Sequence, residues 1–235
     1  MTSIKKIRLH DKIYLKSNRY KKPKEISKLL YKILKKRLSK TKNYKLLEVG
    51  CANGELLFFL DQKFSNIEFC GVDIRRDLIK LAKKKCSPDM YFKKLDYTQN
   101  QNFNKKFDII ICMGTISIFD NLDIFFRNIK RNMKKNSILF ISSNFNDYDF
   151  DVIVAYKDLN SNNLSYQSGW NIWSIKTIKK YFKNQKIIKH PFNIKFDVKQ
   201  NKKDLLRSWT IKIDKKRYFT NALGLIQKKM LLEIK

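Results

Sequence analysis

The chain alternates short apolar runs with stretches in which apolar residues recur every three or four positions. Short continuous apolar runs predict buried strands, and the wider spacing predicts amphipathic helices. The expected strands cover residues 44–49, 67–73, 90–96, 107–113 and 137–143, and the expected helices between them cover 54–64, 75–85 and 122–134. Apolar strands separated by helices predict a parallel sheet covered on both faces, which is an open, doubly wound α/β domain.

The segment before this alternation predicts a further helix. Apolar residues from Ile26 to Leu38 follow the i, i+3, i+4, i+7 spacing of an amphipathic helix, and Pro23 lies near its first turn. We expect residues 1–43 to form a basic, helical N-terminal lid or extension, and residues 44–235 to form the main domain.

The segments after the fifth expected strand are less regular. Residues 144–173 are polar with weak periodicity and predict a long loop, after which Ser174 is expected to cap a helix that runs to Phe182. Residues 186–235 alternate apolar and basic side chains, which predicts antiparallel closing strands with an inserted hairpin. The sheet is therefore expected to be mostly parallel, with antiparallel C-terminal strands.

Composition narrows the class of protein. A chain of 235 residues with 43% hydrophobic residues can build a sizeable core, which excludes a wholly disordered protein. Its apolar runs are shorter than the roughly 20 residues of a membrane span, and its charged N-terminus does not resemble a signal peptide. Four cysteines without a C-x-x-C pair, together with two histidines, predict neither a disulfide framework nor a metal site. We expect a reduced, cytoplasmic protein.

The net charge is high, but its distribution matters more than its total. The chain carries a formal charge of +31, with 43 Lys against 9 Arg. Because Lys has A/T-rich codons, part of this charge reflects the base composition of the gene. Residues 1–43 and 176–235 each carry a net charge of +14, and the residues between them carry +3. The two flanks are thus expected to create a positive surface around a nearly neutral centre.

The sharpest chemical feature is the sequence Leu-Leu-Glu-Val-Gly-Cys-Ala-Asn-Gly over residues 46–54, which leaves an apolar strand and enters a helix. Glycine is needed where the chain turns tightly and where backbone closely approaches a ligand. Asp73 ends the next strand, 23 residues after Gly50. A carboxylate at that place can accept hydrogen bonds from both hydroxyls of a ribose.

This sequence resembles the first motif of the class I S-adenosylmethionine-dependent methyltransferases. Glu48, Gly50, Cys51 and Gly54 match the motif, and Ala52 replaces its middle glycine. The resemblance implies a Rossmann-like methyltransferase fold with S-adenosyl-L-methionine as the cofactor. It also implies that the matching residues form the loop that holds the methionine part of the cofactor.

The resemblance extends over residues 44–143 and implies further cofactor contacts. Asp73 would hold the ribose, and Ile74 would pack on the adenine. Asp96 and Tyr97 match the family's acidic position near the adenine amino group. Met113 ends a strand that resembles the family's fourth motif, and it would lie near the cofactor.

Other readings of these residues fit less well. A dinucleotide-binding domain carries G-x-G-x-x-G, whereas residues 50–54 give G-x-x-x-G. Cys112 lies inside an apolar strand and lacks the context of a pyrimidine-methylating nucleophile, so we expect it in the core. A domain of this fold that binds without catalysing is a third reading, and the intact Glu48, Gly50 and Asp73 argue against it.

Methyl transfer depends mainly on holding the acceptor in line with the donor, and an oxygen acceptor also benefits from a base. His190, near the end of the presumed sixth strand, and His10, in the N-terminal segment, are the candidates for that base. The residues placed to contact the acceptor, just past the fifth strand, are Asn144, Asn146 and Asp147.

Two classes of acceptor stay open. Residues 208–213, 221–224 and 231–234 resemble methyltransferases of bacterial surface-polysaccharide (capsule) pathways, which implies a small anionic acceptor that is phosphorylated or nucleotide-linked. The alternative is RNA, whose phosphates the basic flanks would bind while aromatic side chains stack on its bases. The aromatic residues available for stacking are Tyr14, Tyr20, Trp170 and Trp173.

Overall fold

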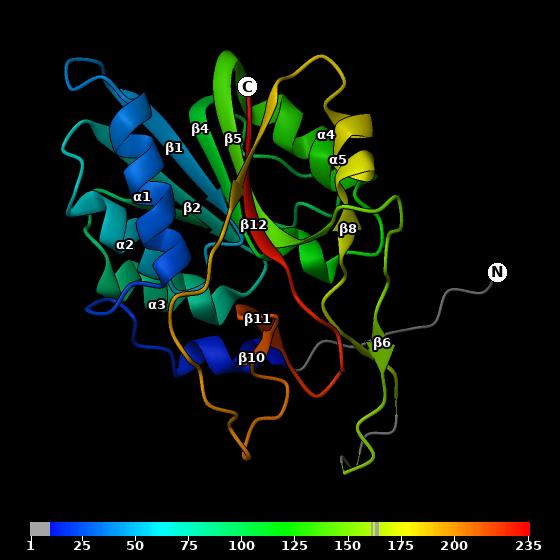
Figure 1. Ribbon diagram of the computed structural model, residues 1–235. Coiled ribbons are helices and arrows are strands. Elements are labelled where there is room, and N and C mark those ends of the chain that lie inside the picture. The colour runs from blue at the N-terminus through cyan, green and yellow to red at the C-terminus, as the bar shows by residue number, and fades with distance from the viewer. Residues whose placement is uncertain (1–9, 161, 163–164) are drawn as a thin grey trace.

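The computed structural model describes residues 10–160, 162 and 165–235, which build on an eight-stranded sheet (Figure 1). The strand order is β3-β2-β1-β4-β5-β12-β9, and the short strand β8 pairs with β5. The strands are β1 (Tyr44–Val49), β2 (Ile67–Asp73), β3 (Tyr91–Lys94), β4 (Phe107–Met113), β5 (Met133–Asn146), β8 (Trp173–Ser174), β9 (Ile187–Pro191) and β12 (Lys229–Ile234). The helices are α1 (Glu25–Arg37), α2 (Glu55–Asp61), α3 (Arg76–Lys85), α4 (Asp123–Asn132) and α5 (Ile175–Tyr181), with the 3₁₀ helices η1 (His10–Leu15) and η2 (Thr115–Ile118).

The strand directions confirm the expected sheet. Strands β1 to β5 run parallel to one another, and β12 lies antiparallel between β5 and β9. Because β9 is antiparallel to β12, it points the same way as β5. The closing part of the sheet therefore contains one reversed strand, β12, rather than a series of them.

Some boundaries differ from the sequence-based expectation. β5 begins at Met133 rather than at residue 137, because the polar residues that follow Met133 also adopt extended backbone. The segment 144–173, expected as a loop, contains β8 and the short pair β6 (Ala155–Tyr156) and β7 (Gln167–Ser168). The capped helix is confirmed, since Thr177 N donates to Ser174 Oγ at 3.0 Å at the start of α5.

Helices cover both faces of the sheet and create two apolar layers (Figure 1). One face packs against α4 and α5, where Phe126 and Ile178 are fully buried. The other face packs against α1, α2 and α3, where Leu30 and Leu34 of α1 are also fully buried. The expected boundary at residue 43 therefore separates two segments that share one core.

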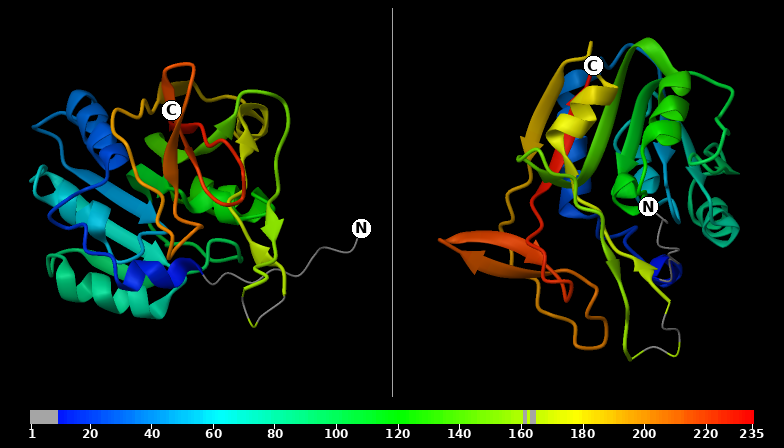
Figure 2. Two further views of the ribbon diagram at one scale, coloured as in Figure 1. Left: turned by 60° about the horizontal axis from the view of Figure 1, so that its bottom comes forward. Right: turned by 90° about the vertical axis from the view of Figure 1, so that its right-hand side faces the viewer.

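Two hairpins extend beyond the carboxyl ends of the parallel strands (Figure 2). One is the β6–β7 pair, and the other joins β10 (Trp209–Ile213) to β11 (Lys216–Thr220), which confirms the expected inserted hairpin. The helix η1 lies at the same end of the molecule. Within the described chain, no helix combines the length and the apolar character that crossing a membrane requires.

A fully buried carboxylate, Glu233 on β12, is surrounded by basic groups. Arg37 Nε and Lys235 Nζ lie 3.0 Å and 3.3 Å from its Oε1, and His190 Nε2 lies 2.8 Å from its Oε2. Burial alone would raise the pKa of Glu233, but hydrogen bonds from His190, Arg37 and Lys235 outweigh burial and hold this pKa below its usual value. The cluster ties α1 to the two closing strands.

We predict that Glu233→Gln lowers the free energy of unfolding by about 2 kcal/mol at pH 7, measured by urea denaturation. Losing one partner of a fully buried ion pair costs about 3–5 kcal/mol, and the cations here are partly exposed, which reduces the loss. Because the pKa of Glu233 is lowered in the folded state, its contribution is present above the usual carboxyl pKa. That contribution is lost as the pH falls through the lowered value, so the difference between wild type and variant should shrink in acid.

The matched control is Glu68→Gln, which removes an exposed ion pair with Lys45 at 3.1 Å. We expect this change to cost at most about 0.5 kcal/mol, as is usual for exposed pairs. Equal losses in the two variants would contradict a structural role for the buried cluster.

Candidate functional site

The loop at residues 50–54 connects the end of β1 to α2, and steric contacts require a glycine at its first position. Gly50 has φ +78°, and its N donates to Val72 O at 2.8 Å. A Cβ at this position would lie 2.4 Å from Thr115 Oγ1, which itself donates to Val49 O at 2.9 Å. The loop therefore packs directly against Thr115 at the start of η2, two residues after β4, and any side chain at residue 50 would separate them.

The second glycine ends the loop and begins the helix. Gly54 has φ +82° and precedes α2, and a Cβ on it would lie 2.8 Å from Cys86 Sγ. Between the two glycines, Ala52 also adopts positive φ, +49°. An L-residue in this conformation is strained by roughly 1–2 kcal/mol, so Ala52, which stands where the resembled motif has its middle glycine, keeps the left-handed turn at an energetic cost.

The carboxylate at the end of β2 reaches this loop. Asp73 Oδ2 accepts a hydrogen bond from Ala52 N at 2.9 Å, and its Oδ1 accepts one from Arg75 N at 2.9 Å. The next side chain, Ile74, is apolar and 54% exposed. The structure thus brings Gly50, Gly54, Asp73 and Ile74, four of the residues expected to contact the cofactor, to one edge of the sheet.

Glu48 on β1 is a buried carboxylate with an unsatisfied oxygen. Its residue is 3% exposed, and Oε2 has no hydrogen-bond partner among the described residues. Burial raises the pKa of Glu48 to about 8; the nearby Lys24 opposes this shift, and Asp73 and Glu55 add to it. Such a group is expected to accept a cationic ligand, because an unpaired buried carboxylate is costly.

The remaining residues predicted to contact the cofactor lie in different environments: Met113 and Asp96 follow or end strands, and Tyr97 lies in the core. Met113 ends β4 and is partly exposed, and Asp96 Oδ1 accepts from Thr98 N at 2.9 Å in the turn after β3. Tyr97 is only 3% exposed, and its hydroxyl donates to Asn132 Oδ1 at 2.9 Å inside the core. The Tyr97 hydroxyl is therefore bonded inside the core and does not point to the loop at residues 50–54.

The cysteines are also core residues. Cys51 and Cys112 are buried, and burial raises the pKa of both thiols, so Cys112 is a core residue as expected.

Of the two histidines expected as candidate bases, only the side chain of His190 is described. His190 lies on β9, where its Nε2 is 2.8 Å from Glu233 Oε2 in the buried cluster. The structure thus gives His190 a structural partner in place of the expected catalytic one. His10 is the first residue of η1, and its side chain lies outside the described residues.

The N-terminal segment is attached to the loop by hydrogen bonds that sequence analysis did not predict. Tyr20 OH donates to Asn53 O at 2.7 Å, and Asn53 Nδ2 donates to Ser17 O at 3.4 Å. Ser17 Oγ donates to Glu55 Oε1 at 2.9 Å, and Arg19 N donates to the same oxygen at 2.6 Å. The structure buries Asn53 (1% exposed), and its position inside the motif gave no indication of this contact.

The segment 144–173 is attached by hydrogen bonds to η2 and to the residue that follows it, just after β4. Asn171 Nδ2 donates to Phe119 O at 2.7 Å, and Trp173 Nε1 donates to Ile116 O at 2.9 Å. Trp173 is 6% exposed, so the expectation that it could stack on a base is wrong. Tyr20 is also engaged, because its ring packs against Phe58 with centroids 5.1 Å apart.

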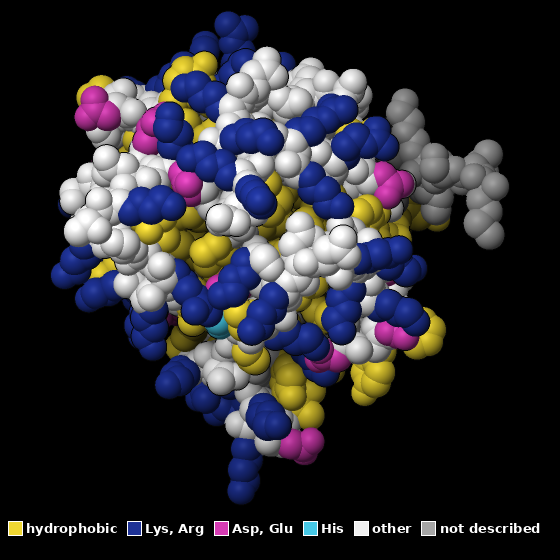
Figure 3. All heavy atoms as spheres, turned by 90° about the horizontal axis from the view of Figure 1, so that it is seen from above, with side chains coloured by type: hydrophobic (Ala, Val, Ile, Leu, Met, Phe, Trp, Pro, Cys, Tyr) yellow, Lys and Arg dark blue, Asp and Glu magenta, His cyan; other side chains and the backbone are white. Residues whose placement is uncertain are grey.

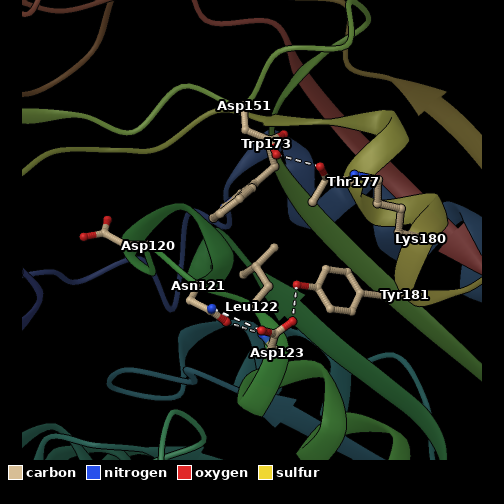
Figure 4. Close-up of a pocket in the computed structure, with 9 residues that line it drawn as sticks. All are labelled: Asp120, Asn121, Leu122, Asp123, Asp151, Trp173, Thr177, Lys180 and Tyr181. Atoms are coloured by element: carbon tan, nitrogen blue, oxygen red, sulfur yellow. Dashed lines mark hydrogen bonds between the residues drawn. The ribbon is translucent and has the colours of Figure 1, made fainter. Parts of the chain in front are cut away.

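A pocket of about 380 Å³ lies beside this attachment, between α4 and α5 (Figure 4). Its acidic side chains are used by the protein itself. Asp151 accepts from Thr177 Oγ1 at 2.6 Å, and Asp123 accepts from Tyr181 OH at 2.7 Å. Figure 4 also shows the Asp120 carboxylate turned away from the other residues. These contacts join α5 to α4 and to the segment 144–173. They are separate from the site formed by the loop at residues 50–54 with Asp73 and Glu48, which we refer to as the loop site.

Comparison with solved structures supports the fold. The S-adenosylmethionine-dependent methyltransferase of Clostridium acetobutylicum superposes with a TM-score of 0.56, over 96% of this chain and 95% of that protein, at 15% identity. At this identity the likeness concerns the fold alone.

Comparisons of sequence identify the family. The chain is 26% identical over 133 residues to a putative methyltransferase, 235L, of Invertebrate iridescent virus 6, covering 57% of this chain and 47% of that protein. It is 28% identical over 127 residues to the ubiquinone biosynthesis O-methyltransferase of Pelagibacter ubique, covering 48% and 49%. The chain thus spans about half the length of these curated relatives. A family model described as a methyltransferase domain matches residues 40–210, and the chain therefore belongs to the methyltransferase-domain family.

Proposed function

We propose that this methyltransferase transfers a methyl group from S-adenosylmethionine to an oxygen of a small anionic acceptor. A nucleotide-activated sugar or another phosphorylated precursor of a surface polysaccharide would be such an acceptor. The hydrogen bond from Ala52 N to Asp73, together with the Glu48 oxygen that has no hydrogen-bond partner among the described residues, carries the cofactor part of the proposal. The name of the Pelagibacter relative, an O-methyltransferase, supports oxygen as the acceptor atom.

The residues at the loop fit this cofactor. Asp73 would accept hydrogen bonds from the ribose hydroxyls, and the exposed Ile74 would cover one face of the adenine. The buried Oε2 of Glu48 would accept the ammonium of the methionine part, which removes the cost of an unpaired buried carboxylate. When bound, the sulfonium supplies an already activated methyl group, so the protein has to position the acceptor and exclude water.

The acceptor would approach past the end of β5. Asn144 pairs with Lys229 there, at the edge of the loop site. Two of the three residues expected to touch the acceptor have other contacts: Asn146 Nδ2 donates to Phe150 O at 3.0 Å, and Asp147 lies 3.2 Å from Lys189 Nζ. Asn144 is therefore the favoured contact, and positioning rather than a histidine base would provide most of the rate.

RNA is the alternative acceptor, and the net charge of +31 is the observation that favours it. Figure 3 views the amino ends of the parallel strands, opposite the loop site, and this face also carries Lys and Arg over its whole extent. The cations are therefore not confined to the face that carries the site, which fits a compositional origin for much of the charge. The engaged side chains of Tyr20 and Trp173 further weaken the case for base stacking.

We predict that Asp73→Ala weakens binding of S-adenosylhomocysteine by about 1.5–3 kcal/mol, the worth of hydrogen bonds to a charged group. Isothermal titration calorimetry measures this change. Asp77→Ala is the control, because it removes a neighbouring exposed carboxylate that is paired with Arg75. Unchanged affinity in the Asp73 variant, or equal loss in both variants, would remove Asp73 from the cofactor site.

We also predict that binding of S-adenosylhomocysteine strengthens as the pH rises from 6 to 8. The pKa of Glu48 is about 8 without ligand, and the ammonium binds the ionised form, so binding below this pH must release a proton. The dissociation constant should fall by up to about tenfold per pH unit and level off near pH 8. Glu48→Gln should remove this dependence while Glu68→Gln keeps it, and a wild-type affinity that does not change with pH would contradict the assignment.

The salt dependence of RNA binding distinguishes a small acceptor from an RNA acceptor. If RNA is the acceptor, bulk RNA should bind with sub-micromolar affinity near physiological salt, and the affinity should fall steeply with salt concentration. We expect weak binding in a fluorescence anisotropy titration against labelled RNA, in keeping with a small acceptor. A steep salt slope at high affinity would favour the RNA alternative instead.

A further inference from the structure

The chain leaves β3 directly beside the end of β2. Asp73 pairs with Lys94 in the sheet, and Leu95 N donates to Asp73 O at 3.0 Å. Asp96 is the next residue, and it is partly exposed. Because β2 and β3 are parallel, Asp96 begins its turn at the same edge of the sheet as the loop site.

Hydrogen bonds within this turn engage one oxygen of the Asp96 carboxylate and leave the other free. Oδ1 accepts from Thr98 N at 2.9 Å and from Thr98 Oγ1 at 2.6 Å, and Asp96 N donates to Gln101 Oε1 at 3.1 Å. Because the side chain bonds to backbone two residues further on, the turn and the carboxylate orient each other. Oδ2 accepts no hydrogen bond from a described residue. An oriented carboxylate therefore keeps one acceptor oxygen for a ligand.

Two asparagines of α4 hold this turn, and we refer to Asn128 and Asn132 as the α4 clamp. Asn128 Nδ2 donates to Tyr97 O at 3.1 Å and to Gln99 O at 2.6 Å, which are the carbonyls on either side of Thr98. Asn132 lies four residues later, on the same face of the helix. Its Oδ1 accepts from Tyr97 OH at 2.9 Å. The turn is thus bonded to α4 through both its backbone and a side chain.

Packing within the core does not account for the α4 clamp. Asn128 is fully buried, and its Oδ1 has no hydrogen-bond partner among the described residues. A buried amide oxygen without a partner costs free energy. The Nδ2 of the same side chain donates twice, and both bonds go to the turn. Holding the turn is therefore what this side chain contributes in return for its unpaired oxygen.

We propose that Asn128 and Asn132 are positioning residues for cofactor recognition, because they hold Asp96 where its Oδ2 accepts a hydrogen bond from the adenine amino group. This inference rests on the proposed function, in which the cofactor binds at the loop site with its adenine beside Ile74. The Asp96 turn cannot move away from that place without breaking buried hydrogen bonds to α4. The α4 clamp would thereby make the site specific for a purine with a 6-amino group, although neither asparagine touches it.

The test compares two ligands by isothermal titration calorimetry: S-adenosylhomocysteine, and its analogue with hydrogen in place of the 6-amino group. We expect wild-type protein to prefer S-adenosylhomocysteine by at least about tenfold, the usual worth of a hydrogen bond to a charged group. Asp96→Ala should abolish this preference. Asn128→Leu removes both N–H donors to the turn, and we expect it to reduce the preference to less than about threefold.

The matched control is Asn171→Leu. Asn171 is also fully buried, and its Nδ2 also donates twice, to Phe119 O at 2.7 Å and to Asp120 Oδ1 at 2.9 Å, but it holds the segment 144–173. We expect both leucine variants to lose stability in urea denaturation, and only Asn128→Leu to lose the preference. If Asn128→Leu does not fold, Tyr97→Phe decides the question. It keeps the aromatic ring, removes the hydroxyl that bonds to Asn132, and should lower the preference by at least about threefold.

The outcomes separate this inference from the proposed function. Protein that binds neither ligand would overturn the proposed function, and this inference with it. Protein that binds both ligands equally well, or that keeps its preference in Asp96→Ala, would overturn the role of Asp96 while leaving the cofactor site in place. A preference that survives in the folded α4 clamp variant, or that falls equally in Asn171→Leu, would overturn the positioning role of the asparagines.

Discussion

The hydrogen bond from Ala52 N to the carboxylate of Asp73 joins the ends of two adjacent parallel strands, and the site depends on it. Parallel pairing of β1 with β2 places both carboxyl ends at one edge of the sheet. The bond then requires Ala52 to adopt positive φ, and this turn lies between two glycines that also have positive φ. Thr115 packs so closely on Gly50 that the end of β4 is fixed to the same point. Three strand ends are thus held by one short loop.

The parts of this arrangement that sequence could predict are those set by local patterning. The strands over 44–49, 67–73 and 107–113 occur with the expected boundaries, because each is a buried apolar run that either ends in Asp73 or is followed by a glycine. β5 was harder, since Lys134, Lys135 and Asn136 near its start carry no strand pattern. They lie where the pairing with β4 is irregular, between the Phe107–Met133 and Ile109–Ile138 pairs. Ser174 could be identified because capping depends on its immediate neighbours.

Contacts between distant segments could not be predicted in this way. His190 was a reasonable base from its position near a strand end, but Glu233 lies opposite it only because β12 is inserted between β5 and β9. Tyr97 follows the acidic residue of a recognisable motif, yet its hydroxyl meets Asn132 of α4 in the core. The attachment of the N-terminal segment to the loop, through Tyr20 and Asn53, likewise joins positions that no local pattern connects.

The contrast between the two buried carboxylates separates structural from functional charge in this molecule. Glu233 has basic partners on both oxygens and a pKa below its usual value, so its charge is satisfied by the fold itself. Glu48 Oε2, like Glu233 Oε1, accepts no hydrogen bond from a described residue, but Glu233 Oε1 has ion-pair partners and Glu48 has none among the described residues. Burial accordingly raises the pKa of Glu48 to about 8. A buried polar atom without a hydrogen bond raises the free energy of the folded state, so the oxygen of Glu48, two residues before Gly50, is the feature that favours a ligand group as its partner.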